Sequence, residues 1–273
     1  MKQIKCLISS AKKRTLVMGS LALVSLAVCS TMLTGCSATK SSSTSLSSIA
    51  SKVKNYKSLS QTDIANGLKE ALNIGITKGI SQLGSNNGFY NDAAARIGLP
   101  EEASVITENL SKLSGGEKLV ESAVKAINAA ASDAVTEAVP IFTSALTSMS
   151  ISDATSILKG GSTAATDYFK TKTKAQLKSL FSKYIGNSLN KKLIGDTSAQ
   201  SAWSTLTTNW NKVATSTAGK IAGLKSVNTD LTDYMADKAV DGVFTKIGEQ
   251  EQKIRTNVSE RTSDLLKRVF ANQ

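Results

Sequence analysis

Large aliphatic residues four positions apart predict the first long helix of the chain. Residues 60–84 place these side chains along one side of a helix. They are Ile64, Leu68, Leu72, Ile76 and Ile80. Ser60 and Asp63 have the spacing of a capping box, in which each residue satisfies a backbone N–H of the other, and Gly84 supplies a stop.

A second row on the same helix has almost no side chains. It consists of Gly67, Ala71, Gly75 and Gly79. Each glycine inside a helix costs about 0.8–1 kcal/mol relative to alanine, so we expect something to approach this row closely. Two occupants fit: another helix packed into the groove, or an acyl chain or other apolar ligand. The alanine-rich segment 117–139 is the candidate for the packing helix.

Helical periodicity continues through the rest of the chain. Pro100 suits the first turn of a second helix, and Pro140 is expected to interrupt the segment 117–139. Ser162 is expected to cap a long helix and Asp230 to begin another, with a loop over residues 218–229. Because no segment alternates convincingly with period two, we expect an all-α fold, a single bundle-like domain of eight or nine helices.

The N-terminus has the features of a lipoprotein signal peptide. Basic residues precede a mostly apolar stretch, and Leu33-Thr34-Gly35-Cys36 matches a lipobox, in which small residues precede an acceptor cysteine. We therefore expect cleavage after Gly35 and lipidation of Cys36, with an uncleaved anchor or a plain secretory signal as the alternatives. The predicted organisation is a signal peptide at 1–35, a serine-rich tether at 36–58 and a helical domain at 59–273.

The same segment predicts where the protein is located. Lipid on Cys36 would hold the chain on a membrane. Ser37, rather than aspartate, follows the cysteine, a pattern that resembles lipoproteins sent on to an outer membrane. We expect a lipid-anchored protein of the cell envelope, on the outer membrane and facing the periplasm.

Removal of the signal peptide changes the charge argument. The chain has 33 basic and 21 acidic residues, but five basic residues leave with the signal, so the remainder carries 28 against 21, a net charge of +7. This charge favours anionic partners such as lipid headgroups or envelope polysaccharide. Neither an arginine-rich arm nor a basic strand with interleaved aromatics is present, so we expect no nucleic-acid partner.

The residue types restrict the chemistry. The chain has no histidine, and its three cysteines are Cys6, Cys29 and Cys36, so His-dependent triads, zinc sites and thiol chemistry are excluded from the domain. We expect no cofactor, no metal and no catalytic residue. The alternative is a hydrolase of envelope material that uses carboxylates or a Ser–Lys pair. Its candidate residues are Glu249 and Glu251, and the pairs Ser122 with Lys125 and Ser156 with Lys159.

Two rows of charge stand on different predicted helices. One row is Lys170, Lys174 and Lys178, and the other is Asp233, Asp237 and Asp241. Like charges four residues apart repel each other, so each row calls for compensation. The rows could pair across a helix interface, in parallel or antiparallel order, or each could lie on a solvated face. A divalent cation on the aspartate row is a third interpretation.

Several segments in order resemble a known family. They are GLKEALNIGITKGISQLG at 67–84, NGFYNDAAARIGLPE at 87–101, VPIF at 139–142, ILKGGSTAATDYFKTKT at 157–173 and RTSDLLKRVF at 261–270. Together they resemble a bacterial envelope lipoprotein family catalogued as a domain of unknown function, from about Tyr56 onward. The resemblance implies a helical, lipoprotein-like domain and transfers no activity.

These features predict a membrane-anchored envelope lipoprotein with a non-enzymatic binding or scaffold domain. Its expected partners are the membrane, through lipid on Cys36, and an apolar or amphiphilic lipid ligand or an envelope protein.

Overall fold

The computed structural model describes residues 59–111 and 114–273. The chain divides into two units, Met1–Tyr56 and Lys57–Gln273, and the second is described here by itself. The predicted signal peptide, the tether and the lipidation of Cys36 lie outside the described residues. They therefore stay predictions.

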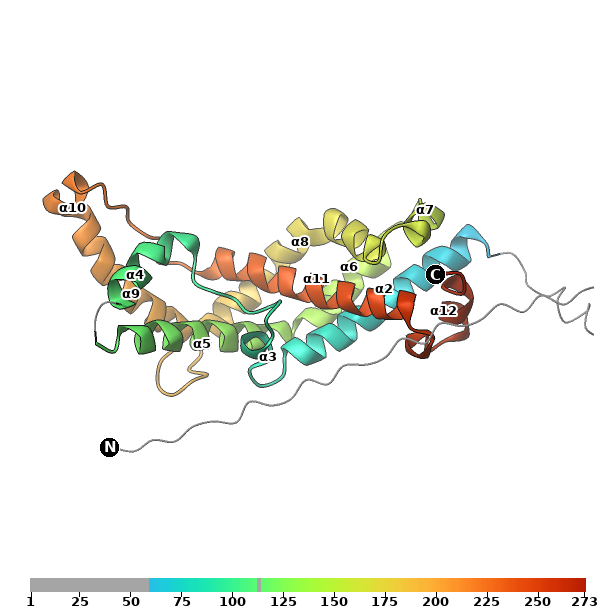
Figure 1. Ribbon diagram of the computed structural model, residues 1–273, viewed down its shortest axis with the longest axis horizontal. Helices are drawn as coiled ribbons and strands as arrows, with labels where there is room; N and C mark the ends of the chain where they lie inside the picture. Colours follow the sequence, from blue (N-terminus) through green and yellow to red (C-terminus); the bar gives the residue numbers. More distant parts are fainter. Residues whose placement is uncertain (1–58, 112–113) are drawn as a thin grey trace, which may run out of the picture. The chain divides into compact units, whose positions relative to one another are not determined.

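The described residues of this unit are helical, as the sequence predicts, and contain no β-strand (Figure 1). They form eleven α-helices, more than the eight or nine expected, because two short helices, α3 and α10, form in segments expected to be loops. The α-helices are α2 (Gln61–Leu83), α3 (Gly88–Asn91), α4 (Ser104–Ser111), α5 (Gly116–Val135), α6 (Ala138–Ser148), α7 (Ala154–Lys159), α8 (Ala164–Leu189), α9 (Ala199–Thr215), α10 (Thr217–Ile221), α11 (Thr232–Thr256) and α12 (Asp264–Val269). Two 3-10 turns, η1 (Glu101–Ala103) and η2 (Val258–Glu260), precede α4 and α12.

Helix α2 begins and ends where its sequence predicts. The Asp63 N–H donates to the Ser60 hydroxyl oxygen at 3.0 Å, and the Ser60 N–H donates to the Asp63 carboxylate at 3.2 Å, which completes the capping box. At the other end the Gly84 N–H donates to the Ile80 carbonyl. The aliphatic row from Ile64 to Ile80 is buried throughout.

The glycine row of α2 is filled by protein, but not by the helix predicted for it. A β-carbon built at Gly75 would lie 3.1 Å from the backbone of Ile247, and one at Gly79 would lie 2.7 Å from Cβ of Lys246, both on α11. Gly67 is closed in the same way by Val269. The assignment of segment 117–139 as the partner was wrong, because that segment forms α5, which packs mainly against α8.

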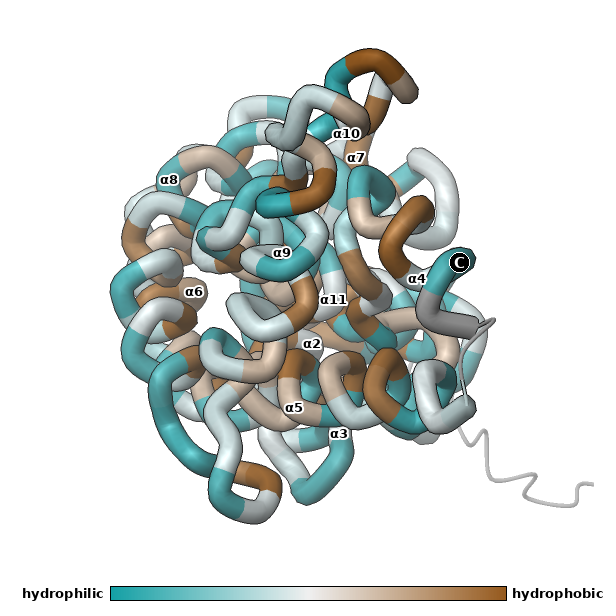
Figure 2. The backbone as a smooth tube through the Cα atoms, turned by 90° about the vertical axis from the view of Figure 1, so that its left-hand side faces the viewer, coloured by the Kyte–Doolittle hydropathy of each residue, from teal (hydrophilic) through white to brown (hydrophobic). Residues whose placement is uncertain are grey.

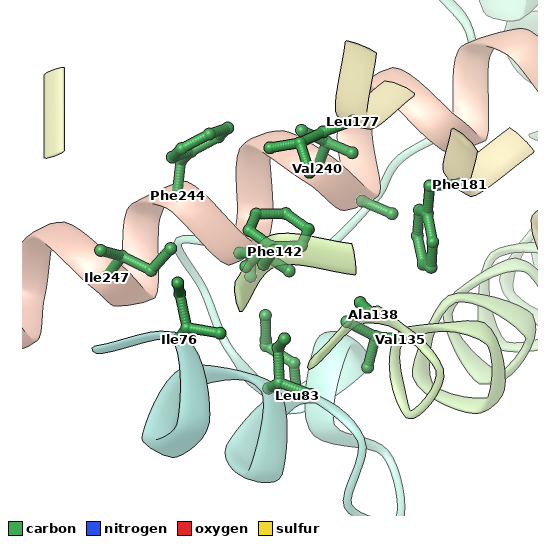
Figure 3. Packing of buried hydrophobic residues seen from close by; sticks show 14 of the residues in the cluster. Ile76, Leu83, Val135, Ala138, Phe142, Leu177, Phe181, Val240, Phe244 and Ile247 are labelled. Atoms are coloured by element: carbon green, nitrogen blue, oxygen red, sulfur yellow. The ribbon is translucent and has the colours of Figure 1, made fainter. Parts of the chain in front are cut away.

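Helices α2 and α11 therefore form the centre of the bundle. In the end-on view of Figure 2 they lie in the middle, with α3, α5, α6 and α8 around them. Phe142 of α6, Phe169 of α8 and Phe244 of α11 pack together with ring centroids 5.5–6.4 Å apart. Figure 3 shows this region, where Ile76 and Leu83 of α2 face the side chains of α11 and α6. Among the described residues, the buried core is one cluster whose members run from Ile64 to Phe270.

Four helix boundaries differ from those expected. Helix α11 begins at Thr232 rather than at Asp230. The break after α5 falls at Thr136 and Glu137, and Pro140 lies within the first turn of α6, where its missing N–H removes no intrahelical hydrogen bond. Helix α8 begins after Thr163 rather than Ser162, and its first N–H groups are satisfied from α11, as described below. The predicted loop 218–229 begins with most of α10.

Candidate functional site

The two predicted charge rows meet at the edge of the α8–α11 interface. Lys170 lies 2.8 Å from Asp241, and Lys174 lies 3.0 Å from Asp237 and 2.9 Å from Asp241. Lys178 completes the series at 2.9 Å from Asp233. We call these six residues the lysine–aspartate ladder. Its pairing order is antiparallel, so the structure confirms the interface interpretation.

The ladder holds its central groups in their charged forms. Burial by itself would raise the pKa of Asp241, but hydrogen bonds and charge attraction from Lys170 and Lys174 outweigh it, and the pKa is lowered. Burial would likewise lower the pKa of Lys174, but Asp241 and Asp237 raise it. The lysines satisfy the aspartate row, so the chain itself supplies the compensating cations.

Two shallow hollows flank the ladder, one on each side of Thr245. The first has a volume of about 300 Å³, is lined partly by Tyr234, Lys238 and Asp241, and adjoins the loop that includes Arg96. The second, also about 300 Å³, lies between α8 and α11. Its walls include Thr166, Asp167, Phe244 and Glu249. This volume is at the lower limit for small-molecule sites. The lining of the first hollow is mainly polar and suits a small polar group, whereas the lining of the second is mainly apolar.

A second charged cluster surrounds Lys246, which is only 6 % exposed although it is a lysine. Its ammonium group forms ion pairs with Asp92 and, at 2.7 Å, with Glu249. Burial would lower the pKa of Lys246, but these two carboxylates raise it. The same contact holds the pKa of Asp92 below its ordinary value against the effect of burial.

The most deeply buried charges are Glu251 and Arg255, one turn apart on α11. The Glu251 carboxylate accepts hydrogen bonds from the N–H groups of Ala165 and Thr166, at 3.0 and 2.7 Å, and from the Thr166 hydroxyl at 2.6 Å. It therefore caps α8 from another helix. Arg255 donates to Glu251 and to the carbonyls of Leu158 and Ile157, which joins α7, α8 and α11.

The residues of the predicted hydrolase alternative are not brought together. Glu249 and Glu251 are two positions apart on α11 and point into different surroundings, the first toward Lys246 and the second into the interior. Ser122 and Lys125 are exposed on α5, and Ser156 and Lys159 are exposed at α7. Among the hydrogen bonds of the described residues, none joins serine to lysine within either pair.

The comparison with known proteins gives one match. Residues 58–271 match the family described as "Protein of unknown function (DUF4197)". The chain belongs to this family. The match covers nearly all of the described DUF4197 domain and agrees with the resemblance seen in the sequence. No curated protein and no solved structure matches.

Two further observations concern the described part of the DUF4197 domain. Within residues 59–111 and 114–273, no helix is both long and apolar enough to cross a membrane. Over the same residues, no three acidic, cysteine or histidine side chains are grouped so that they could hold a metal ion.

Sequence reasoning missed the structural role of Glu251 and Arg255. The sequence does contain one indication of this role. Glu251 and Arg255 are four residues apart, and they lie beside Ile254 in a stretch whose other apolar residues face the core. An ion pair at that spacing beside a buried stripe indicates partial burial. The identity of the capped helix had no signal in the sequence, because α8 lies 85 residues earlier in the chain.

Proposed function

We propose that this chain is a lipid-anchored protein of the cell envelope whose helical domain is a non-enzymatic binding or scaffold module. The observation that supports the anchor is the lipobox that ends at Cys36, upstream of a unit whose described residues form one buried core from Ile64 to Phe270. Two or more acyl chains on Cys36 would give stable membrane attachment.

The packing of the domain supports surface binding rather than an internal ligand. The glycine row of α2, which could have accepted an acyl chain, is occupied by Ile247, Lys246 and Val269. The buried charged groups are engaged in holding helices together. A partner is therefore expected on the outer surface, and an envelope protein or an amphiphilic envelope molecule fits the positive charge of the processed chain.

One observation favours the alternative function, a hydrolase of envelope material. Asp167 and Glu249 both line the hollow between α8 and α11, and two carboxylates in one cleft can divide acid and base roles. Each already has a partner, since the Thr163 hydroxyl donates to Asp167 and Lys246 to Glu249. Glu249→Gln would abolish turnover of envelope substrates by the purified chain if this alternative holds. Unchanged turnover would reject a catalytic role for Glu249.

Lipid attachment is tested by growing cells that express the full chain with radiolabelled palmitate and measuring label on the chain. We expect Cys36→Ser to remove the label, to block processing and to leave the precursor mass. Cys29→Ser is the matched control, because it removes a signal-peptide thiol that is not in the lipobox, and it should label as the parent does. Label that persists in Cys36→Ser would overturn the anchor.

The compartment is tested on the same cells. Membranes separated by density should carry the labelled chain in the outer-membrane fraction, and protease added to intact cells should leave it uncut if it faces the periplasm. Recovery in the soluble fraction would contradict the anchored location.

Internal ligand binding is tested by native mass spectrometry on residues 37–273 expressed in the envelope. We expect the bare mass, because α11 and α12 fill the glycine row. One lipid per chain that survives purification and is taken up again when offered would contradict this expectation. A bare chain directs the search to surface partners, which crosslinking in cells would identify.

A further inference from the structure

Helices α9 and α10 form a compact hairpin. Ser216 lies between the two helices, and its side chain accepts a hydrogen bond from the Gly219 N–H at 3.1 Å and donates to the Val213 carbonyl at 2.7 Å. Gly219 packs so closely that a β-carbon there would collide with the Val213 carbonyl oxygen. Gly223, with φ of +71°, then turns the chain back.

The returning segment is fastened to α9 by side-chain hydrogen bonds. The Trp203 and Trp210 indole N–H groups donate to the carbonyls of Asn228 and Lys225, at 3.0 and 2.9 Å. Asn211 makes a two-way pair with Val227, with both bonds at 2.8 Å. These bonds hold the returning segment against α9.

The tip of this hairpin is both apolar and basic. Ile221, the last residue of α10, is 84 % exposed, and Val213 on the last turn of α9 is 53 % exposed. Lys212, Lys220 and Lys225 are exposed on the same hairpin. The sequence from 197 to 229 contains no aspartate or glutamate, so no acidic residue within the hairpin neutralises these lysines.

The hairpin lies at one end of the bundle, where α9 packs against α5 and α10 contacts mainly α9. Figure 1 shows α10 as the outermost element at one end of the described unit, beyond α9, while α12 and the start of α2 lie at the opposite end. The hairpin is therefore at the end remote from the start of α2. A convex tip of this kind cannot enclose a small ligand, but it can insert into a deformable surface such as a lipid bilayer.

We propose that the α9–α10 hairpin docks on an anionic phospholipid surface, with Ile221 inserted among the headgroups and Lys212, Lys220 and Lys225 on the phosphates. The combination is the one that interfacial membrane binding requires: an apolar side chain that gains by leaving water, and cations attracted by the negative surface potential. This contact is separate from lipid on Cys36 and gives the domain a second attachment to membrane.

An anionic lipid surface fits the hairpin better than an acidic protein does. Protein interfaces of ordinary size need a broad complementary patch, whereas the most exposed apolar residue here is a single isoleucine on a five-residue helix. A bilayer needs no such patch, because it adapts to a protruding side chain. The acidic-protein alternative predicts no binding to vesicles.

The test is co-sedimentation of residues 37–273 with vesicles. This segment keeps every core residue of the described unit and lacks Cys36, so the result does not depend on lipidation. We expect binding to vesicles of phosphatidylglycerol mixed with phosphatidylcholine, little binding to pure phosphatidylcholine, and loss of binding as salt rises. Absence of binding to the phosphatidylglycerol vesicles would overturn the proposal.

Matched variants assign the binding to the hairpin. Lys220→Glu with Lys225→Glu should weaken binding at least about tenfold, since each basic residue near an anionic surface contributes several-fold. Lys159→Glu with Lys253→Glu changes the net charge equally on α7 and α11 and should have little effect. Ile221→Ser should weaken binding about tenfold, while Val258→Ser, which removes another exposed apolar side chain near α12, should not. Equal losses in tip and control variants would overturn the proposal.

A second measurement does not depend on loss of function. Residues 37–273 contain no cysteine, so Ile221→Cys creates a unique site for an environment-sensitive fluorophore. Phosphatidylglycerol vesicles should shift its emission to the blue, as transfer out of water requires. The same label at Val258→Cys should not respond. A label at 221 that stays in water while the chain is vesicle-bound would refute insertion of the tip.

Discussion

The Nε atom of Arg255 lies 2.8 Å from the Glu251 carboxylate inside the bundle, where Glu251 is fully buried. This pair is more than a contact within α11, because Glu251 caps α8 and Arg255 binds carbonyls of α7. The Arg255 guanidinium also lies 5.5 Å from the ring centroid of Phe270, close to the C-terminus. Two regions far apart in the sequence, α7 with α8 and α11 with the C-terminal residues, are therefore joined by two side chains.

Removing the carboxylate should destabilise the domain strongly. Glu251→Ala leaves Arg255 without its charge partner and the first N–H groups of α8 without an acceptor, and we expect a loss of about 3–5 kcal/mol in the free energy of unfolding. Urea unfolding followed by circular dichroism measures it. Lys267→Ala, which breaks a surface pair with Asp264, is the control and should cost less than about 1 kcal/mol. Equal effects of the two variants would contradict a structural role for the buried pair.

Two glycine-to-alanine substitutions, one in the glycine row of α2 and one in α8, should change stability in opposite directions. At Gly79 a β-carbon would lie 2.7 Å from Cβ of Lys246, so Gly79→Ala must push α2 and α11 apart, and we expect a loss of about 1–3 kcal/mol. At Gly186 of α8 the nearest atom would be 3.8 Å away. Gly186→Ala should therefore gain about 0.5–1 kcal/mol from helix propensity alone. Thermal unfolding of both variants decides, and a stabilised Gly79→Ala would show that the row is not tightly packed.

The ladder predicts how stability changes with acid. The pKa of Asp241 is lower in the folded protein than its ordinary value of 3.8, so the carboxylate stabilises the fold above that value and its contribution is lost as the pH falls through the folded pKa. Asp241→Asn should lower the free energy of unfolding by about 1 kcal/mol at neutral pH and by less at pH 2. The loss is small because the carboxylate is partly solvated. Asp233→Asn, where the carboxylate is 85 % exposed, should change little at either pH. The free energy of unfolding is measured for both proteins from neutral pH to pH 2. If the values for Asp241→Asn and the parent do not converge as the pH falls, ionisation of Asp241 does not stabilise the fold.

The lysines predict how stability changes at alkaline pH. The pKa of Lys174 and of Lys246 is raised above 10.5, so their contribution is present below that value and is lost as the pH rises through the folded pKa. We expect stability to fall above about pH 10.5, and Lys246→Met to flatten that decline. A Lys246→Met curve parallel to that of the parent would show that the Asp92 and Glu249 contacts do not stabilise the fold.

Substitution of the two tryptophans of α9 should destabilise the domain to different extents. Trp203 is buried and Trp210 is half-buried, although each donates its indole N–H to the returning segment. Trp203→Phe loses the bond in the interior and leaves a space, which should destabilise the unit by about 2–3 kcal/mol, whereas Trp210→Phe, open to water, should cost about 1 kcal/mol. Chemical unfolding compares them directly. A larger loss at Trp210 would mean that the hairpin, rather than the core, limits stability.

Local features of the sequence predicted most of the long helices correctly. Ser60 and Asp63 cap α2 because both partners lie within one turn, and the buried row of α2 follows from a period of four. The error at Pro140 has a local cause as well, since a proline breaks a helix only beyond its first turn. The short helix α10 was missed because five residues show no periodicity.

For the candidate sites too, local features could be predicted from the sequence, whereas the long-range contacts could not. The sequence by itself determined that the glycine row needs a close neighbour, that the two charge rows need compensation, and that histidine and thiol chemistry are absent from the domain. Periodicity identifies a face but not what covers it. Only the tertiary structure decided that α11, not α5, fills the row, that the ladder pairs in antiparallel order, and that Glu251 caps α8. These contacts join residues tens of positions apart, and their choice depends on how all the helices fill one core together.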